Sequence, residues 1–435
     1  MNAGLSTKNA PSPSVVLPHY AFGAVAFIIA GIMMFFASDT LTASYIGPKV
    51  LALTHILVLS WITVIIFGAL YQLIPVVMEV KLYSETLALA SFVLIAIGSI
   101  LMVYSFWNNY IGNNIIIMIG GTMVVLSIIL FAINTVKSAL NSTVKTIENK
   151  FIVTSIVWLL LTVLLGFFII LNASYGYISK SNIELLKIHF QFGIIGWFMM
   201  LVIGVASTLM PMFFISHKLK KAYLTNAYYM INIGIVILSA LLYFFPNIYA
   251  LLAVGILIIG GFGFFIKYNY DAYKKRLRRK LDIGMKLSVL AFVLLFFVLI
   301  LAFMVMFGSK FIPNFSVNFN LAFGTLIILG FLTALILGQM YKTLPFIVWL
   351  QKYQDKVGKF KIPLPNDLYS EKVADMHYYT YLTAITTLFA GLMLSMSMII
   401  KIAAVFFVIT ALLFAYNTFK ILLHKEDLKP LDNNK

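Results

Sequence analysis

The stretch Trp61–Pro75 reads WITVIIFGALYQLIP, with an aromatic residue, a glycine and a proline placed seven residues apart. The same spacing recurs at 197–211, WFMMLVIGVASTLMP, and at 331–345, FLTALILGQMYKTLP, where phenylalanine replaces tryptophan. Residues seven apart lie on nearly one stripe of an α-helix, about two turns from each other. This stripe predicts close helix packing at the glycine and a break in the helix near the proline.

These three stretches lie in the second, sixth and tenth of twelve apolar runs, each of about 20 residues or more, the length that crosses a bilayer. The last two runs cover about 378–400 and 402–423. Of all residues, 62% are hydrophobic and 10% are charged, and the mean hydropathy is +1.01, which excludes a soluble globular protein. Long unbroken runs also exclude a membrane β-barrel. We predict an all-α integral membrane protein with twelve transmembrane helices in one polytopic domain, surrounded by the lipid bilayer.

The recurrence in every fourth run predicts three four-helix units, over about 17–136, 151–267 and 285–423. The simplest arrangement is a three-fold pseudosymmetric bundle whose inner members are the second, sixth and tenth helices.

The net charge of +17 is unevenly distributed among the loops. With twelve spans, 26 of the 31 Lys and Arg residues fall on the side that carries both termini. The positive-inside rule therefore predicts that both termini are cytoplasmic, in the cytoplasmic (inner) membrane. The same rule accounts for the basic charge without nucleic acid. Because the chain has no cysteine, a metal or cofactor would have to be held by His, Met, Tyr or carboxylate side chains.

Two histidines lie near the outer ends of inner helices, His55 in THILVLSW and His189 in IHFQFGIIGW. They precede the glycines of the repeat by 13 and 15 residues, so their positions are roughly equivalent. A histidine within hydrocarbon must find a polar partner or a metal. Neutral imidazole suits both haem iron and copper, and both residues are therefore candidate cofactor and metal ligands. The alternative is a hydrogen-bonded or interfacial histidine.

Three further residues are weaker candidates. His19 and His377, each followed by tyrosine, stand near the inner ends of the first and eleventh runs, where histidines commonly cap or anchor a helix; ligation is the alternative. Lys342 lies between Gly338 and Pro345 near the cytoplasmic end, where its side chain would be expected to extend to the interface. A functional role for this lysine is the alternative.

Twelve spans, cytoplasmic termini, four-helix periodicity and the second-helix histidine together resemble subunit I of the haem-copper oxidases, which include cytochrome oxidases and nitric oxide reductases. The resemblance covers nearly the whole chain as architecture, and as sequence it is concentrated in the second and sixth helices. It implies that His55 is an axial ligand of a haem and that His189 corresponds to a copper or non-haem metal ligand. It also implies respiratory-chain subunits or a cytochrome c-type donor as partners.

The chain departs from this family at several ligand positions. The seventh helix has no histidine pair, the tenth has no histidine, and Lys401 stands where the family has two arginines. A complete dioxygen-reducing centre is therefore not expected. The leading hypothesis is a haem- or copper-binding membrane protein in respiratory electron transfer, or in the chemistry or sensing of a diatomic gas (O2 or NO). If it is an enzyme, it is an oxidoreductase of this type. The alternatives are a cofactor-free transporter or channel, or an assembly subunit on the same bundle.

Overall fold

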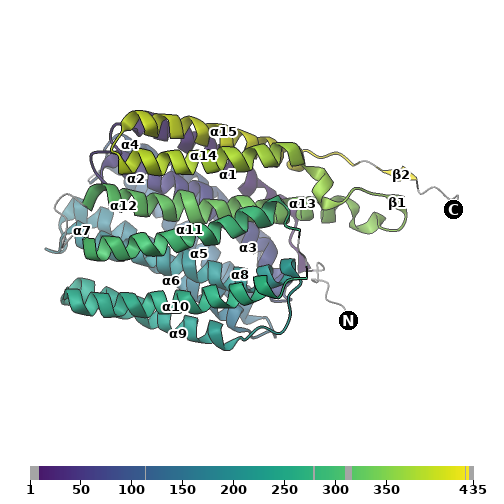
Figure 1. Ribbon diagram of the computed structural model, residues 1–435, viewed down its shortest axis with the longest axis horizontal. Helices are drawn as coiled ribbons and strands as arrows, with labels where there is room; N and C mark the ends of the chain where they lie inside the picture. The colour runs from purple at the N-terminus through teal and green to yellow at the C-terminus, as the bar shows by residue number, and fades with distance from the viewer. Residues whose placement is uncertain (1–8, 113, 278–279, 309–315, 427, 431–435) are drawn as a thin grey trace. The chain divides into compact units, whose positions relative to one another are not determined.

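The computed structural model describes residues 9–112, 114–277, 280–308, 316–426 and 428–430, and its described secondary structure is almost entirely helical (Figure 1). Within these residues, eleven helices are long and apolar enough to cross a membrane. A further helix, α14 (Glu371–Met393), overlaps the eleventh predicted span, about 378–400. The fold fits an integral membrane bundle, which confirms the predicted fold class to that extent.

The chain forms two compact units that alternate along the sequence. Unit 1 contains Met1–Pro11, Tyr71–Ser105 and Tyr110–Lys280, and unit 2 contains Ser12–Leu70, Phe106–Asn109 and Leu281–Lys435.

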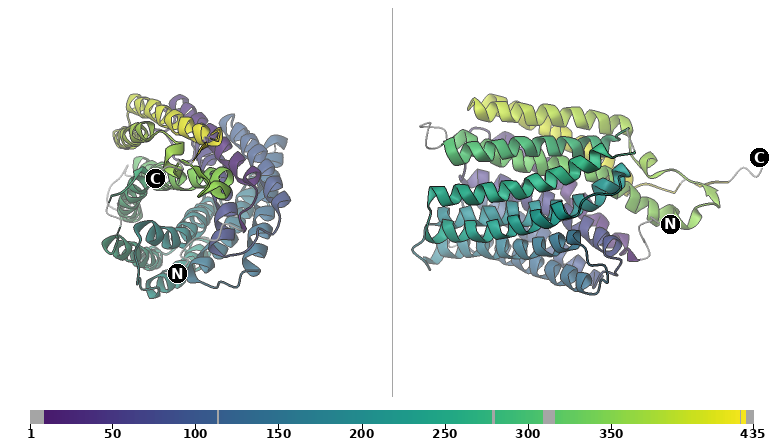
Figure 2. Two further views of the ribbon diagram at one scale, coloured as in Figure 1. Left: turned by 90° about the vertical axis from the view of Figure 1, so that its right-hand side faces the viewer. Right: turned by 60° about the horizontal axis from the view of Figure 1, so that its bottom comes forward.

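Unit 1 holds the end of α3 (Val64–Val77), most of α4 (Glu85–Trp107) and the helices that follow it. These are α5 (Ile115–Leu140), α6 (Ile147–Tyr175), α7 (Asn182–Gln191), η3 (Phe192–Met199), α8 (Met200–Phe214), α9 (Ala222–Phe244) and α10 (Ile248–Lys274). The helices α9 and α10 lie side by side as an antiparallel pair (Figure 2).

Unit 2 begins with the first helices of the chain and ends with the last. Its elements are α1 (Pro13–Ala37), α2 (Pro48–His55), η2 (Ile56–Thr63), the start of α3, α11 (Ile283–Gly308), α12 (Ser316–Thr325), η4 (Leu326–Leu332), α13 (Thr333–Tyr353), η5 (Gln354–Lys356), η6 (Pro365–Leu368), α14 and α15 (Ser397–Leu422). A two-residue strand, β1 (Phe360–Lys361), pairs antiparallel with β2 (Lys429–Pro430).

The three helices with the repeated signature are the most buried of the candidate spans. The share of the most apolar window that is buried is 78% for Pro48–Val77, 72% for Asn182–Phe214 and 72% for Val317–Lys356. The other eight spans have between 22% and 50% of the corresponding window buried. These burial values agree with the prediction that the three are inner helices.

The glycine of each signature lies against the helix that precedes it. A Cβ placed on Gly68 would lie 3.2 Å from the carbonyl oxygen of Val16, one on Gly204 would lie 3.0 Å from that of Glu148, and one on Gly338 would lie 2.6 Å from that of Gly284. The prediction of close packing at these glycines is confirmed in all three helices.

Each of these helices also contains a π-helical segment that the sequence did not reveal. The segments η2, η3 and η4 begin at Ile56, Phe192 and Leu326, in each case twelve residues before the glycine of the repeat. In η4, the hydroxyl of Tyr381 donates to the carbonyl oxygens of Leu329 and Gly330, each at 2.7 Å. Side-chain donors therefore stabilise the wider helical turn. π-Helical turns inside α-helices are often found at functional sites.

The prediction of a break near each proline is wrong for one of the three helices. α3 and α8 end two and three residues after their prolines, but α13 continues through Pro345 to Tyr353. Proline removes one helical donor and leaves the carbonyl four residues earlier without its helical partner. In α8 this carbonyl, of Ser207, accepts a hydrogen bond from the hydroxyl of Tyr268 (3.4 Å).

The predicted boundary near Lys401 is also displaced. The chain turns between α14 and α15 at 394–396, where Ser395 has a φ of 53° and Leu394 and Met396 flank it. Lys401 lies in the second turn of α15 and forms an ion pair with Asp39 (3.2 Å). Hydrogen bonds from Ser397 and Lys401 lower the pKa of Asp39 below its usual value.

Candidate functional site

His55 is the last residue of α2 and immediately precedes the π-helical segment η2. Its Nδ1 lies 2.7 Å from the carbonyl oxygen of Leu51. Because a carbonyl only accepts hydrogen bonds, Nδ1 carries the proton and Nε2 retains its lone pair. The ring packs against Phe106, with centroids 4.6 Å apart and planes tilted by 34°. Metal-binding histidines are commonly held in this way, with one nitrogen bonded to a carbonyl and the other directed at the metal.

A hollow of about 380 Å³ lies at the N-terminal end of α2, in the same unit. It is lined by Thr40, Ala43, Ser44, Gly47, Pro48, Lys49, Val50, Trp107 and Asn109. The ammonium of Lys49 lies 5.2 Å from the centre of the Trp107 ring. Lys49 gives this hollow a positive charge six residues before His55, which suits a ligand with a carboxylate group.

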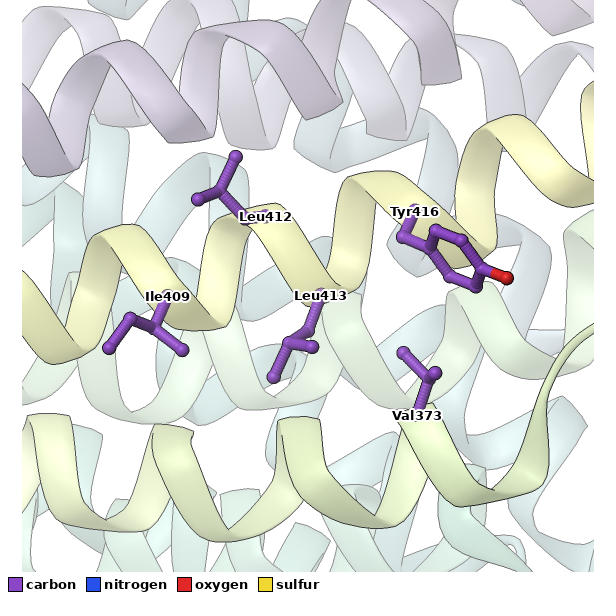
Figure 3. Close-up of a pocket in the computed structure, with 5 residues that line it drawn as sticks. All are labelled: Val373, Ile409, Leu412, Leu413 and Tyr416. Carbon is purple, nitrogen blue, oxygen red and sulfur yellow. The ribbon is translucent and has the colours of Figure 1, made fainter.

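A second hollow, of about 350 Å³, lies between α14 and α15 and has an apolar lining (Figure 3). It is lined by Val373, Ile409, Leu412, Leu413 and Tyr416. Because no charged side chain lines it, we do not assign it to the candidate site.

His189 lies in α7 of unit 1, so the structure does not bring it into one unit with His55. Its Nδ1 lies 2.9 Å from the carbonyl oxygen of Thr162, the same proton arrangement as in His55. The ring packs over Gly166, where an added Cβ would lie 2.7 Å from Cε1. The two candidate histidines therefore share a hydrogen-bonding pattern.

The register of the repeat places Gln191, rather than His189, at the position of His55. Gln191 precedes its glycine by 13 residues and its π-helical segment by one, as His55 does. Its Nε2 donates to the carbonyl oxygen of Ile235 and to the hydroxyl of Ser239, each at 2.8 Å. The position equivalent to the histidine thus serves helix packing in unit 1.

His19 and His377 are completely buried, with 0% of each side chain exposed. Tertiary packing therefore covers both side chains. His19 packs over Gly68, where an added Cβ would lie 2.7 Å from the histidine Cβ. His377 lies beside Tyr341, whose hydroxyl is 3.4 Å from Nδ1.

The side chain of Lys342 is largely enclosed by protein. Its side chain is 10% exposed and forms an ion pair with Asp282, which is 17% exposed, at the start of α11. The aliphatic part of Lys342 covers Gly284, with Cγ 3.2 Å from an added Cβ. This partly buried ion pair links α13 to the start of α11 within unit 2.

Among the residues that the structure describes, no group of three or more His, Asp or Glu side chains could hold a metal ion. A copper centre built from three histidines does not fit this chain. A haem held by one protein side chain needs a single imidazole nitrogen with a lone pair, and Nε2 of His55 has one.

Sequence reasoning missed two polar clusters that have the same construction. The Asn134 cluster consists of Tyr71, Ser84, Ser91 and Asn134 in unit 1, and the Asn417 cluster consists of Tyr341, Ser370, His377 and Asn417 in unit 2. A repeated sequence could have revealed them: YSE occurs at 83–85 and 369–371, and FAxNTxK occurs at 131–137 and 414–420.

No family model and no curated protein matches the sequence. The structure matches a cryo-EM structure of a heme-copper terminal oxidase dimer, with a TM-score of 0.55 and 10% sequence identity. The match covers 96% of this chain and 85% of that chain. The chain has the fold of a heme-copper terminal oxidase. At this low identity the likeness extends to the fold alone, and it agrees with the resemblance found in the sequence.

Proposed function

We propose that the chain is a haem-binding membrane protein that holds one haem near the outer face through His55. The observation that carries this proposal is the hydrogen bond from Nδ1 of His55 to the carbonyl oxygen of Leu51, which leaves Nε2 for the metal. The matched structure is an oxidase that contains heme and copper, and this favours haem as the ligand.

Three residues have distinct roles in this site. His55 would hold the haem iron, Phe106 packs on the imidazole ring of His55, and Lys49 would be available to the carboxylates of the haem. A bound haem would supply one-electron chemistry or an iron that binds a diatomic gas. The protein would then act in respiratory electron transfer, or in the chemistry or sensing of O2 or NO.

His189 is a second candidate ligand, for haem or copper, in unit 1. Its Nδ1 is held by Thr162 as Nδ1 of His55 is held by Leu51. We do not propose dioxygen reduction by a copper-containing centre, because the described residues lack a three-ligand group.

We further propose the orientation and symmetry expected from the sequence. Both termini are cytoplasmic, in the inner membrane, and the three four-helix units are related by a three-fold pseudosymmetry. The 26-to-5 division of basic residues supports the orientation. The matching contacts of Gly68, Gly204 and Gly338 support the repeats. Respiratory subunits or a cytochrome c-type donor are the proposed partners.

The experiment is a reduced-minus-oxidised spectrum with metal analysis on protein purified in mild detergent. We expect stoichiometric haem that is lost in His55→Ala and retained in His217→Ala, an exposed histidine that serves as the control. Loss of haem only in His189→Ala would place the haem site in unit 1. A folded, colourless and metal-free preparation would contradict the proposal and favour a cofactor-free transporter or an assembly subunit.

A further inference from the structure

The hollow between α14 and α15 is a groove on the exposed surface of unit 2 (Figure 3). Three residues of its α15 wall are strongly exposed, Ile409 at 38%, Leu412 at 51% and Tyr416 at 55%. Val373, in the first turn of α14, belongs to the other wall. Because α15 is long and apolar enough to cross a membrane, an exposed apolar face on it contacts the acyl chains of the bilayer.

The length of the groove face matches one leaflet of the bilayer. Ile409 precedes Lys420, a lysine in the last turn of α15, by 11 residues, which is about 16 Å along the helix. Half of the hydrocarbon core measures about 15 Å. The ring of Tyr416 lies between them, and its hydroxyl is directed away from Ile409 (Figure 3). The groove therefore runs from the middle of the bilayer to the surface at which α15 ends.

Two lysines without partners stand at this end of the groove. Lys372 directly precedes Val373, and Lys420 follows Tyr416 by four residues, so that it lies one turn further along the same face. Both lysines are exposed, and neither forms an ion pair or a hydrogen bond with the residues that the structure describes. Three other lysines of this unit do form ion pairs, namely Lys342, Lys356 and Lys401. Two positive charges thus remain available to an anion.

The acidic residues at this end do not oppose an anion in the groove. Glu371 and Asp375 are each two residues from Val373, which places them about 160° around the axis of α14 from it. The carboxylate of Glu426 is already paired with Lys356. The rim of the groove is therefore basic.

The repeated sequences identify an equivalent helix pair, α4 and α5, in unit 1. The motif FAxNTxK aligns 414–420 with 131–137, and YSE aligns 369–371 with 83–85. By this alignment Lys420 corresponds to Lys137, Tyr416 to Ile133 and Lys372 to Thr86. One of the two lysines and the tyrosine are thus present only in unit 2.

The lysine that both units share has a partner only in unit 1. Lys137 donates to the hydroxyl of Tyr83 (3.1 Å), and its ammonium lies 4.6 Å from the centre of that ring. The equivalent tyrosine of unit 2, Tyr369, is 5% exposed and packs on Tyr341, with ring centroids 5.0 Å apart. Lys420 therefore lacks the partner that Lys137 has, although the surrounding sequence is the same.

We propose that the groove between α14 and α15 binds one anionic phospholipid from the leaflet in which α15 ends. One acyl chain lies along the apolar walls and reaches Ile409. The phosphate accepts hydrogen bonds from the ammonium groups of Lys372 and Lys420, and the hydroxyl of Tyr416 donates to an oxygen of the headgroup or the glycerol ester. Each lysine near an anionic lipid contributes about fivefold in affinity, so the pair contributes more than tenfold.

The test is lipid binding to delipidated protein in mild detergent, followed by native mass spectrometry, and it does not require a bound haem. Phosphatidylglycerol and phosphatidylcholine with the same acyl chains are titrated separately. We expect phosphatidylglycerol to bind at least tenfold more tightly. The double variant Lys372→Gln with Lys420→Gln should lose this tenfold preference and bind phosphatidylcholine as before. Lys137→Gln is the matched control and should keep the preference.

A second pair of variants tests the groove itself without changing a charge. Leu413→Trp fills the groove and should weaken the binding of phosphatidylglycerol at least tenfold. Leu130→Trp, at the equivalent position of α5, should leave it unchanged, and both leucines are only partly buried, so both variants should fold. Equal affinity for the two lipids would overturn the proposal. So would tight binding of phosphatidylglycerol that survives the double lysine variant or Leu413→Trp.

Discussion

Asn134 and Asn417 make the same pair of backbone hydrogen bonds in different units of the protein. Oδ1 of Asn134 accepts from the backbone N–H of Ser84 (2.9 Å), and its Nδ2 donates to the carbonyl of the same serine (2.8 Å). Asn417 bonds Ser370 in the same way, at 2.9 and 3.2 Å. Each serine is the residue before α4 or α14, and its hydroxyl accepts from a backbone N–H three residues later. Each asparagine therefore ties the start of one helix to its partner helix.

Replacing either asparagine with leucine should destabilise the protein by about 1–3 kcal/mol. The change leaves the part-buried backbone N–H of Ser84 or Ser370 without its partner, whereas the carbonyl of the same serine still accepts from the backbone N–H of Ala88 or Ala374. Thermal unfolding in detergent would measure the loss. Thr383→Val, which changes an exposed side chain bonded only within its own helix, is the control. Equal melting temperatures for Asn417→Leu and wild type would show that water satisfies these groups.

Gly338→Ala should also destabilise the protein, by roughly 1–3 kcal/mol. The added Cβ would lie 2.6 Å from the carbonyl oxygen of Gly284, so the backbone of α11 or α13 would have to move. Gly263→Ala is the matched control, because nothing lies within 4 Å of its added Cβ. Unfolding curves should show no loss of stability for Gly263→Ala. Its higher helix propensity could raise the stability by up to about 1 kcal/mol. The same response at both glycines would contradict the packing seen here.

Lys342→Met should destabilise the protein by roughly 1–3 kcal/mol, because it removes the ion pair between Lys342 and the partly buried carboxylate of Asp282. The double variant Lys342→Met with Asp282→Leu should recover most of this loss, since no charge then remains buried. Denaturant unfolding of the two single variants and the double variant forms a mutant cycle. Additive losses would mean that the two charges act independently.

The proposed orientation can be tested with single cysteines in the cysteine-free chain. An impermeant maleimide added to intact cells should label Tyr177→Cys, in the loop between α6 and α7, and should not label Lys145→Cys, between α5 and α6. Both positions are exposed and should be labelled after lysis. Labelling of Lys145→Cys in intact cells would show that the chain has the opposite orientation.

Much of the fold was predictable from sequence because membrane helices are specified locally. In lipid, each backbone polar group must be satisfied within its own helix, so an apolar run of sufficient length predicts a span. The glycine of each repeat predicted a close contact, which Gly68, Gly204 and Gly338 all make. The sequence predicted that His55 and His189 occupy roughly equivalent positions, but in the register of the repeat Gln191 stands at the position of His55. His189 is offset by two residues, and such an offset turns a side chain by about 200° around the helix axis.

The sequence by itself therefore determined the helices and the three close glycine contacts. Only tertiary structure decided that Lys342 pairs with Asp282, that Nδ1 of His189 bonds Thr162 and that His377 faces Tyr341. The physical reason is that a polar side chain in an apolar interior must find a partner, and that partner comes from whichever helix packing brings near. Hydropathy specifies which residues are buried, but the register between helices specifies which of them meet.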